Sequence, residues 1–206
     1  MDEQKMLNTL DSLYNKALDG IPMVSKSVDE LVDDYMKKES SPGKAAKALI
    51  KNQIIKCGTS GFLSGLGGAL TLAVTLPANI TSVLYVQLRM IAAIAKIGGY
   101  DLNSDRVQTL VYVCLTGSAA ADVFKQAGIK VGNKFANAMI NKIPGKALMA
   151  INQKVGFRLI TKYGTKGAVN LVKVVPVAGG IVGGAIDVGS TKVIAENAYK
   201  IFIEKA

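Results

Sequence analysis

The feature that most constrains the fold is a run without any charged side chain, from Cys57 to Leu88. Five glycines and Pro77 interrupt the run. A glycine inside a helix costs about 1 kcal/mol relative to alanine, so these glycines must be compensated by close approach of neighbouring backbones. The run therefore predicts two closely packed helices that meet near Pro77. The second should continue to about Ile97 and stop at the glycine pair 98–99.

The length of this second helix raises the question of whether it crosses a membrane. Residues 77–97 would extend about 31 Å at 1.5 Å per residue, which is enough to span a bilayer. Its eight Ile, Leu and Val residues each favour insertion by about 0.3–0.6 kcal/mol, whereas Arg89 opposes it by about 2.5–3.5 kcal/mol. Asn79, Gln87 and Lys96 add to this cost. We therefore expect a compact bundle that buries the hairpin or lies against a bilayer, with a true span as the alternative.

Local stop and start signals predict helices on the N-terminal side of this run. Apolar residues at helical spacing between Met6 and Ala17 indicate a first helix, which Gly20 should end. Either Ser25 or Ser27 is placed to cap a second amphipathic helix. A third helix should carry Pro42 in its first turn, where the missing N–H has no cost.

The remaining segments also favour helices. One is expected from Ser104 until shortly before Gly128, followed by two short basic helices separated by Pro144–Gly145. A last helix from about Val177 to Ile203 begins with glycines at four-residue spacing. The chain is thus predicted to be an all-α, compact multi-helix bundle with two glycine-rich apolar helical segments, in one domain of residues 1–206. Within it we distinguish amphipathic helices (1–56), the glycine-rich apolar hairpin (57–99), basic helices (104–173) and the glycine-rich C-terminal helix (174–206).

Charge is distributed unevenly along the chain. Residues 1–56 contain nine acidic and nine basic residues, whereas no acidic residue lies between Asp122 and Asp187. A stretch of one sign attracts anionic surfaces, by about 1 kcal/mol per cation close to an anionic leaflet. A solvated surface is the alternative, and a single arginine with few aromatic residues argues against nucleic acid. The candidate lipid-binding cations are Lys125, Lys130, Lys134, Lys142, Lys146, Lys154, Arg158, Lys162, Lys166 and Lys173.

Residues and motifs typical of catalysis are scarce. The chain has no histidine, which removes the commonest general base and metal ligand, and its two cysteines are isolated within apolar segments. No phosphate-binding loop, dinucleotide fingerprint or nucleophile elbow is present. We therefore predict no catalytic residue, no metal and no cofactor. An enzyme acting on lipid, with a carboxylate pair such as Asp101 and Asp105, is a less favoured alternative.

Two charged residues lie within the apolar helices. Arg89 and Asp187 are each flanked by several uncharged residues. Burying either charge unpaired would cost several kcal/mol, which makes a mutual ion pair a reasonable hypothesis. The alternative is that each side chain faces water.

Several blocks of the sequence resemble the EcsC protein family. The run GTSGFLSGLGGALTLAVTLPANITSVLYVQLRMIAAIAKIGGYDL from Gly58 is similar to the family signature, in which a GFxxGLGG helix leads to a proline, a QLRMIAAIA helix and a GYD turn. GIKVGNKF from Gly128, the long block from Ile140 and VPVAGGIVGGAIDV from Val175 resemble its later blocks in order. The resemblance covers about residues 8–203.

The resemblance implies a bacterial protein of a family named from a gene beside an ABC transporter, and it assigns no biochemical activity. On the matching positions we expect Arg89, Asp101 and Asp187 to form structural ionic contacts, which we call polar locks. We expect helix packing at Gly65, Gly67, Gly68, Gly179, Gly183 and Gly184.

These observations favour a function at a membrane. The N-terminus has no basic segment followed by an apolar one, so we expect a cytoplasmic protein at the inner face of the cell membrane. We expect a non-catalytic protein that binds anionic lipid and supports a transport or envelope process, with a membrane transporter as a candidate partner. The alternative is a soluble protein that holds a lipid or other apolar ligand in a glycine-lined cavity.

Overall fold

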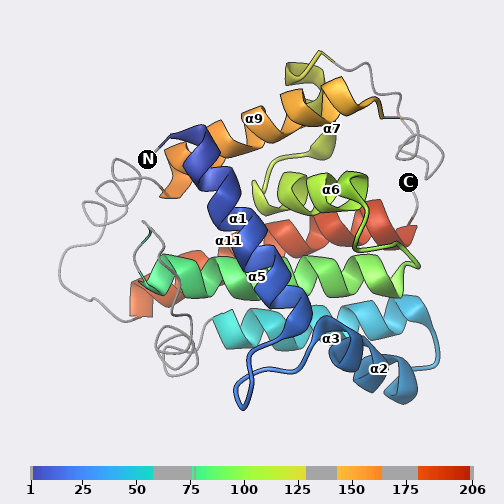
Figure 1. Cartoon of the computed structure of the whole chain (residues 1–206). Coiled ribbons are helices and arrows are strands. Elements are labelled where there is room, and N and C mark those ends of the chain that lie inside the picture. Colours follow the sequence, from blue (N-terminus) through green and yellow to red (C-terminus); the bar gives the residue numbers. More distant parts are fainter. Residues whose placement is uncertain (1, 58–75, 77, 129–142, 164–180, 205–206) are drawn as a thin grey trace.

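The computed structural model describes residues 2–57, 76, 78–128, 143–163 and 181–204, with the backbone alone for 78–79 and 181–187 (Figure 1). Within these residues the chain forms eight α-helices and no β-strand, which confirms the predicted all-α bundle. The glycine-rich hairpin segment 58–75 lies outside the described residues. The helices are α1 (Glu3–Asp19), α2 (Val28–Lys38), α3 (Pro42–Cys57), α5 (Ala78–Ile97), α6 (Asp105–Leu115), α7 (Ala120–Gln126), α9 (Gly145–Tyr163) and α11 (Ile181–Tyr199).

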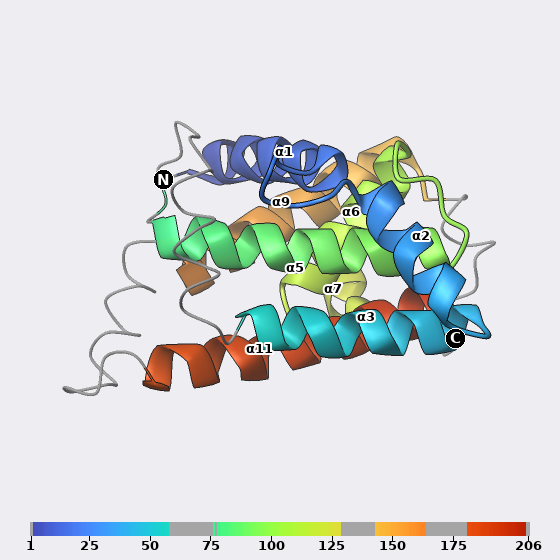
Figure 2. The same ribbon diagram turned by 90° about the horizontal axis from the view of Figure 1, so that it is seen from below.

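Helix α5 is the centre of the bundle. It packs against α1, α2, α3, α6 and α11, which surround it on several sides (Figures 1 and 2). Every residue from Thr81 to Ala95 is buried, including Gln87 and Arg89. A helix that is apolar on all sides must be enclosed by others, and this accounts for the near absence of charge in its sequence.

The enclosure of α5 bears on the question of a membrane span. Residues Ile80–Ile97 are long and apolar enough to cross a membrane, with a mean hydropathy of 1.5, but 89% of this window is buried inside the bundle. The paired helices α6 and α7 also pass the same test together, although they are bent by 109°. In this fold the neighbouring helices take the place that lipid would occupy around a span.

The N-terminal helices end and begin where the local signals predict. Gly20 ends α1 with φ of +81°, a conformation that favours glycine. Ser27 caps α2: its hydroxyl accepts a hydrogen bond from the Glu30 N–H, and the Glu30 carboxylate accepts one from the Ser27 N–H. Pro42 is the first residue of α3. All three predictions are confirmed.

The expectation of one helix from Ser104 to Gly128 is wrong, because the chain turns sharply after Leu115. Gly117 adopts φ of +73°, and the Thr116 hydroxyl donates to the Val113 carbonyl while accepting from the Ser118 N–H. The side chain thus satisfies backbone groups that the end of α6 leaves open. The bend directs α7 onto α9.

The last helix is confirmed over most of its predicted length. Helix α11 runs through segments that would suit a strand in isolation, and its predicted start at 177–180 lies outside the described residues. It ends in a π-helical turn, Lys200–Glu204, in which Ile201 and Phe202 are buried. The Phe202 ring contacts Tyr100 edge to face, with 5.0 Å between centroids. This contact joins the C-terminal turn to the end of α5.

Candidate functional site

The candidate site is the outer face of α9, and its position follows from how this helix begins and packs. The Pro144 carbonyl accepts hydrogen bonds from the N–H groups of Ala147 and Leu148, which starts the helix. The buried side of α9 packs against α1, α6 and α7. Gly156 faces α1, where a Cβ would lie in van der Waals contact with Glu3 and Leu7.

The opposite side of α9 combines cations with large apolar side chains. Lys146 and Lys154 are exposed, and Arg158 is partly exposed. Between them Met149 is 62% exposed and Phe157 is 59% exposed, although apolar side chains of this size are usually buried in a bundle. We call these five residues the α9 surface.

The basic residues of α9 form a row at four-residue spacing. Lys154, Arg158 and Lys162 follow one another along the helix, so that their side chains emerge on the same side. Lys162 is partly buried, and its Nζ lies 4.9 Å from the centroid of the Tyr163 ring. The row leads from the exposed side of α9 towards α7.

The structure brings two predicted cations from different helices together. Lys125 of α7 and Arg158 of α9 line one surface hollow of about 600 Å³, with Asp122 as an acidic neighbour. On the other side, Phe157 lines a hollow with Asp2 and two residues that follow it. Acidic side chains thus border the α9 surface without interrupting its cations. Lys130, Lys134, Lys142, Lys166 and Lys173 lie outside the described residues.

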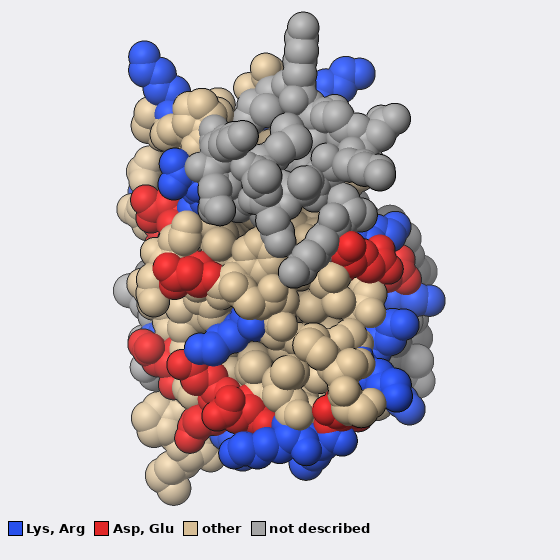
Figure 3. All heavy atoms as spheres, turned by 90° about the vertical axis from the view of Figure 1, so that its right-hand side faces the viewer, with Lys and Arg blue, Asp and Glu red and all other residues tan. Residues whose placement is uncertain are grey.

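Other parts of the surface carry both signs of charge. On the face shown in Figure 3, acidic and basic side chains are interspersed around a centre of uncharged residues. Two exposed ion pairs, Lys26 with Asp34 and Lys96 with Asp29, occur around α2. Helix α9 differs from these regions in that its own sequence contains no acidic residue.

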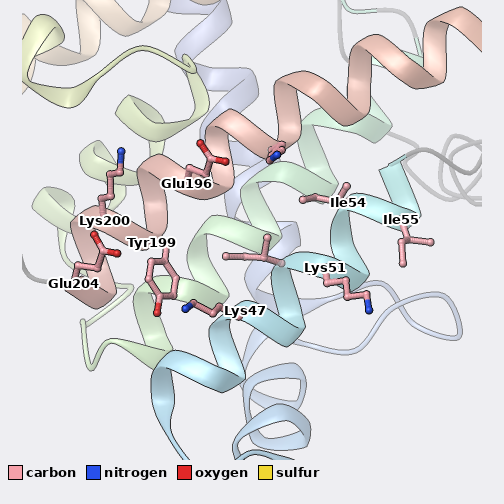
Figure 4. A pocket seen from close by; sticks show the side chains of 10 residues that line it. Lys47, Lys51, Ile54, Ile55, Glu196, Tyr199, Lys200 and Glu204 are labelled. Carbon is pink, nitrogen blue, oxygen red and sulfur yellow. The ribbon is translucent and has the colours of Figure 1, made fainter.

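A second feature, which the sequence did not reveal, is a groove between α3 and α11. It has a volume of about 510 Å³ (Figure 4). Ile50 and Ile54 of α3 lie along it, and lysines from both helices surround it. The lysines and isoleucines of α3 recur at helical spacing, which is a detectable signal. Their partners on α11 are about 140 residues away in sequence, so the groove exists only in the folded chain.

A comparison with protein families gives a match over nearly the whole chain. The model of the EcsC protein family matches residues 3–203. The chain belongs to the EcsC protein family. No curated protein and no solved structure matches it. The assignment therefore names the family of this EcsC chain, and any function has to be argued from its own residues.

Arg89, one of the expected polar locks of this EcsC chain, is buried at 4% exposure. Its Nη2 donates to the Lys26 carbonyl at 2.5 Å, and its Nε has no hydrogen-bond partner among the residues that the structure describes. Burial lowers the pKa of Arg89, while nearby Tyr85 and Glu30 act in the opposite direction. The Asp187 side chain lies outside the described part of the structure, so the Arg89–Asp187 ion pair stays a prediction.

The other expected structural positions are placed only in part. Asp101 is exposed in the turn after α5, and its Oδ1 accepts a hydrogen bond from the Asn103 N–H at 3.0 Å. Gly183 and Gly184 lie in α11, but their packing is outside what the structure describes. Gly65, Gly67, Gly68 and Gly179 lie outside the described residues altogether. No group of three or more possible metal-binding side chains occurs in the described ranges.

Proposed function

We propose that this EcsC-family chain is a non-catalytic protein that binds peripherally to anionic membranes through the α9 surface. The observation that carries the proposal is the exposure of Met149 and Phe157 among Lys146, Lys154 and Arg158. Amphipathic helices that lie in a membrane interface combine apolar anchors with cations in this way. The process it supports is transport or envelope maintenance at the inner face of the cell membrane.

The magnitudes explain why both kinds of residue are needed. Lys146, Lys154 and Arg158 would contribute on the order of 3 kcal/mol near an anionic leaflet, equivalent to a Kd of about 6 mM. Burying the exposed parts of Phe157 and Met149 would add roughly 1–2 kcal/mol each. Together the electrostatic and apolar contributions lower the Kd towards the micromolar range, whereas either contribution alone gives only weak binding.

Co-sedimentation of the purified chain with neutral and anionic vesicles over a salt series tests the proposal. We expect binding that requires anionic lipid and fades with salt, because the cations are exposed and screened. Phe157→Ser should weaken binding at all salt concentrations, by on the order of tenfold for about 1.4 kcal/mol. The double variant Lys154→Glu, Arg158→Glu should remove the preference for anionic vesicles.

Two control variants separate the α9 surface from the rest of the molecule. Met36→Ser removes a side chain on α2 that is 39% exposed, and Lys37→Glu reverses an exposed charge on the same helix. Both should leave vesicle binding nearly unchanged. Equal binding to neutral and anionic vesicles, or the same loss in the control and α9 variants, would show that the α9 surface is not the binding site. Resistance to extraction by high salt would contradict peripheral attachment.

A further inference from the structure

The groove between α3 and α11 is distinct from the α9 surface. Figures 1 and 2 place α3 and α9 on different sides of the central helix α5. The volume of about 510 Å³ falls within the roughly 300–1,000 Å³ of small-molecule sites. The groove is therefore large enough for a small-molecule ligand of its own, and its assignment does not rest on membrane binding by α9.

The floor of the groove is apolar. Ile50 and Ile54 are partly buried against the bundle, and Ile55 is 58% exposed at the same end of α3. The apolar residues span Ile50 to Ile55, about 8 Å along α3 at 1.5 Å per residue. The apolar part is thus a narrow strip that suits an alkyl chain. A stable protein partner would need to bury about 800 Å² of surface on each side.

The rim of the groove is mainly basic on both sides. Lys47 and Lys51 come from α3, and Lys192 and Lys200 come from α11 or the turn that follows it. None of these four lysines forms an ion pair with any residue that the structure describes. Two acidic side chains, Glu196 and Glu204, also line the groove. The excess of cations favours an anionic head group over a cationic one.

One end of the groove has a defined wall. The Nζ of Lys47 lies 5.5 Å from the centroid of the Tyr199 ring, so a cation and an aromatic ring meet across the two helices (Figure 4). Gly43 makes room for this ring, because a Cβ there would lie 3.1 Å from the Tyr199 hydroxyl. Ile54 and Ile55 lie towards the other end of α3 (Figure 4). Lys51 lies beside these isoleucines (Figure 4), so cations accompany the apolar side chains along the groove.

We infer that this groove binds one fatty acid, with part of its alkyl chain along Ile50, Ile54 and Ile55 and its carboxylate among the rim lysines. The apolar strip provides the burial that holds the chain. The lysines provide the counter-charge and the hydrogen-bond donors that a carboxylate requires. The groove thereby favours a ligand that combines an alkyl chain with a negative charge.

Calorimetric titration of the full chain with palmitate tests this assignment. We expect one site per chain, with binding at least tenfold weaker for the alkyl trimethylammonium ion of equal chain length, because its charge is reversed. Ile55→Ser should weaken palmitate binding by on the order of tenfold, and Lys47→Glu with Lys51→Glu should do the same. Folding of each variant is checked by its circular dichroism and unfolding midpoint.

Val193→Ser is the matched control, because Val193 is 44% exposed on α11 but does not line the groove. It should leave palmitate binding unchanged, as should Phe157→Ser on the α9 surface. Retention of palmitate binding by folded groove variants, or equal binding of the alkyl cation, would overturn the assignment. So would a dimer of the chain that Ile55→Ser dissociates. Loss of vesicle binding in Phe157→Ser with palmitate binding intact separates this inference from the proposed function.

Discussion

The backbone of Gly98 lies directly against the carbonyl group of Phe202. A Cβ built at position 98 would stand 2.2 Å from the Phe202 oxygen and 3.2 Å from a ring carbon of Tyr100. Gly98 follows the last residue of α5, and Phe202 is buried in the C-terminal π-helical turn. The absence of a side chain at one residue therefore permits the contact between the central helix and the end of the described chain.

Replacement of Gly98 by alanine should destabilise the protein. The new methyl group would meet backbone, which cannot turn aside as a side chain can, so we expect a loss of about 1–3 kcal/mol in the free energy of unfolding. Urea unfolding measures this change. Gly189→Ala is the control, since no described residue lies within 4 Å of a Cβ there. Within helix α11 this alanine should raise the free energy of unfolding by about 0.5–1 kcal/mol. Equal effects at the two positions would contradict the contact.

The buried hydrogen bond between Gln87 and Thr191 predicts a characteristic double-mutant cycle. The Gln87 Nε2 donates to the Thr191 hydroxyl at 2.9 Å, and both residues are fully buried. Thr191→Val should cost about 1–3 kcal/mol, because it leaves the buried amide without its partner. The double variant Gln87→Leu, Thr191→Val should recover much of that loss. Additive losses in urea unfolding would show that the two side chains do not interact.

Alkaline pH should destabilise the fold through Tyr112. Burial, and then the hydrogen bond to Asp11, raise the pKa of Tyr112 above its ordinary value of 10.0. The folded state therefore keeps a proton that the unfolded state releases above about pH 10. The contribution of Tyr112 to the free energy of unfolding is therefore fully present below pH 10 and falls as the pH rises beyond it.

Urea unfolding at pH 8 and at pH 10.5 measures this effect. Tyr112→Phe keeps the edge-to-face contact with Tyr14, whose centroid is 5.9 Å away, and removes the titrating hydroxyl. The variant should lose less stability between the two pH values than the unmodified chain does. Part of the fall should persist, because burial also raises the pKa of Tyr14. Parallel losses in both proteins would exclude Tyr112 as a source.

Thiol labelling should report unfolding. Cys57 and Cys114 are both fully buried, and burial raises the pKa of the Cys114 thiol. Because the thiolate is the reactive form, an aromatic disulfide reagent should label neither cysteine at an appreciable rate in the native protein. Both should react in guanidinium chloride. Fast labelling of one thiol under native conditions would show that its surroundings open locally.

The helices that sequence predicted well are those with local end signals. Gly20, Ser27 and Pro42 each act through backbone geometry or hydrogen bonds within a few residues, so their effect can be recognised without the rest of the fold. The break after Leu115 was not predicted, because the local sequence around Gly117 is compatible both with a continued helix and with a turn. Its direction depends on the packing of α7 against α9.

The candidate sites show the same limit. An excess of cations is visible in composition, and it indicated Lys154 and Arg158 of the α9 surface. The exposure of Phe157 was not predicted, because apolar residues in an amphipathic pattern are normally assigned to the buried side. Whether such a residue is covered depends on which neighbours reach it. The pairing of Lys47 with Tyr199 likewise requires contact between distant segments.

The central position of α5 has a consequence for how the chain is made. Helices α1, α2 and α3 precede α5, but α6 and α11, which cover its other sides, are synthesised later. Until α11 emerges from the ribosome, the nascent chain exposes part of a segment long and apolar enough to cross a membrane. The order of translation thus creates an interval in which part of this apolar helix is exposed before the finished fold conceals it.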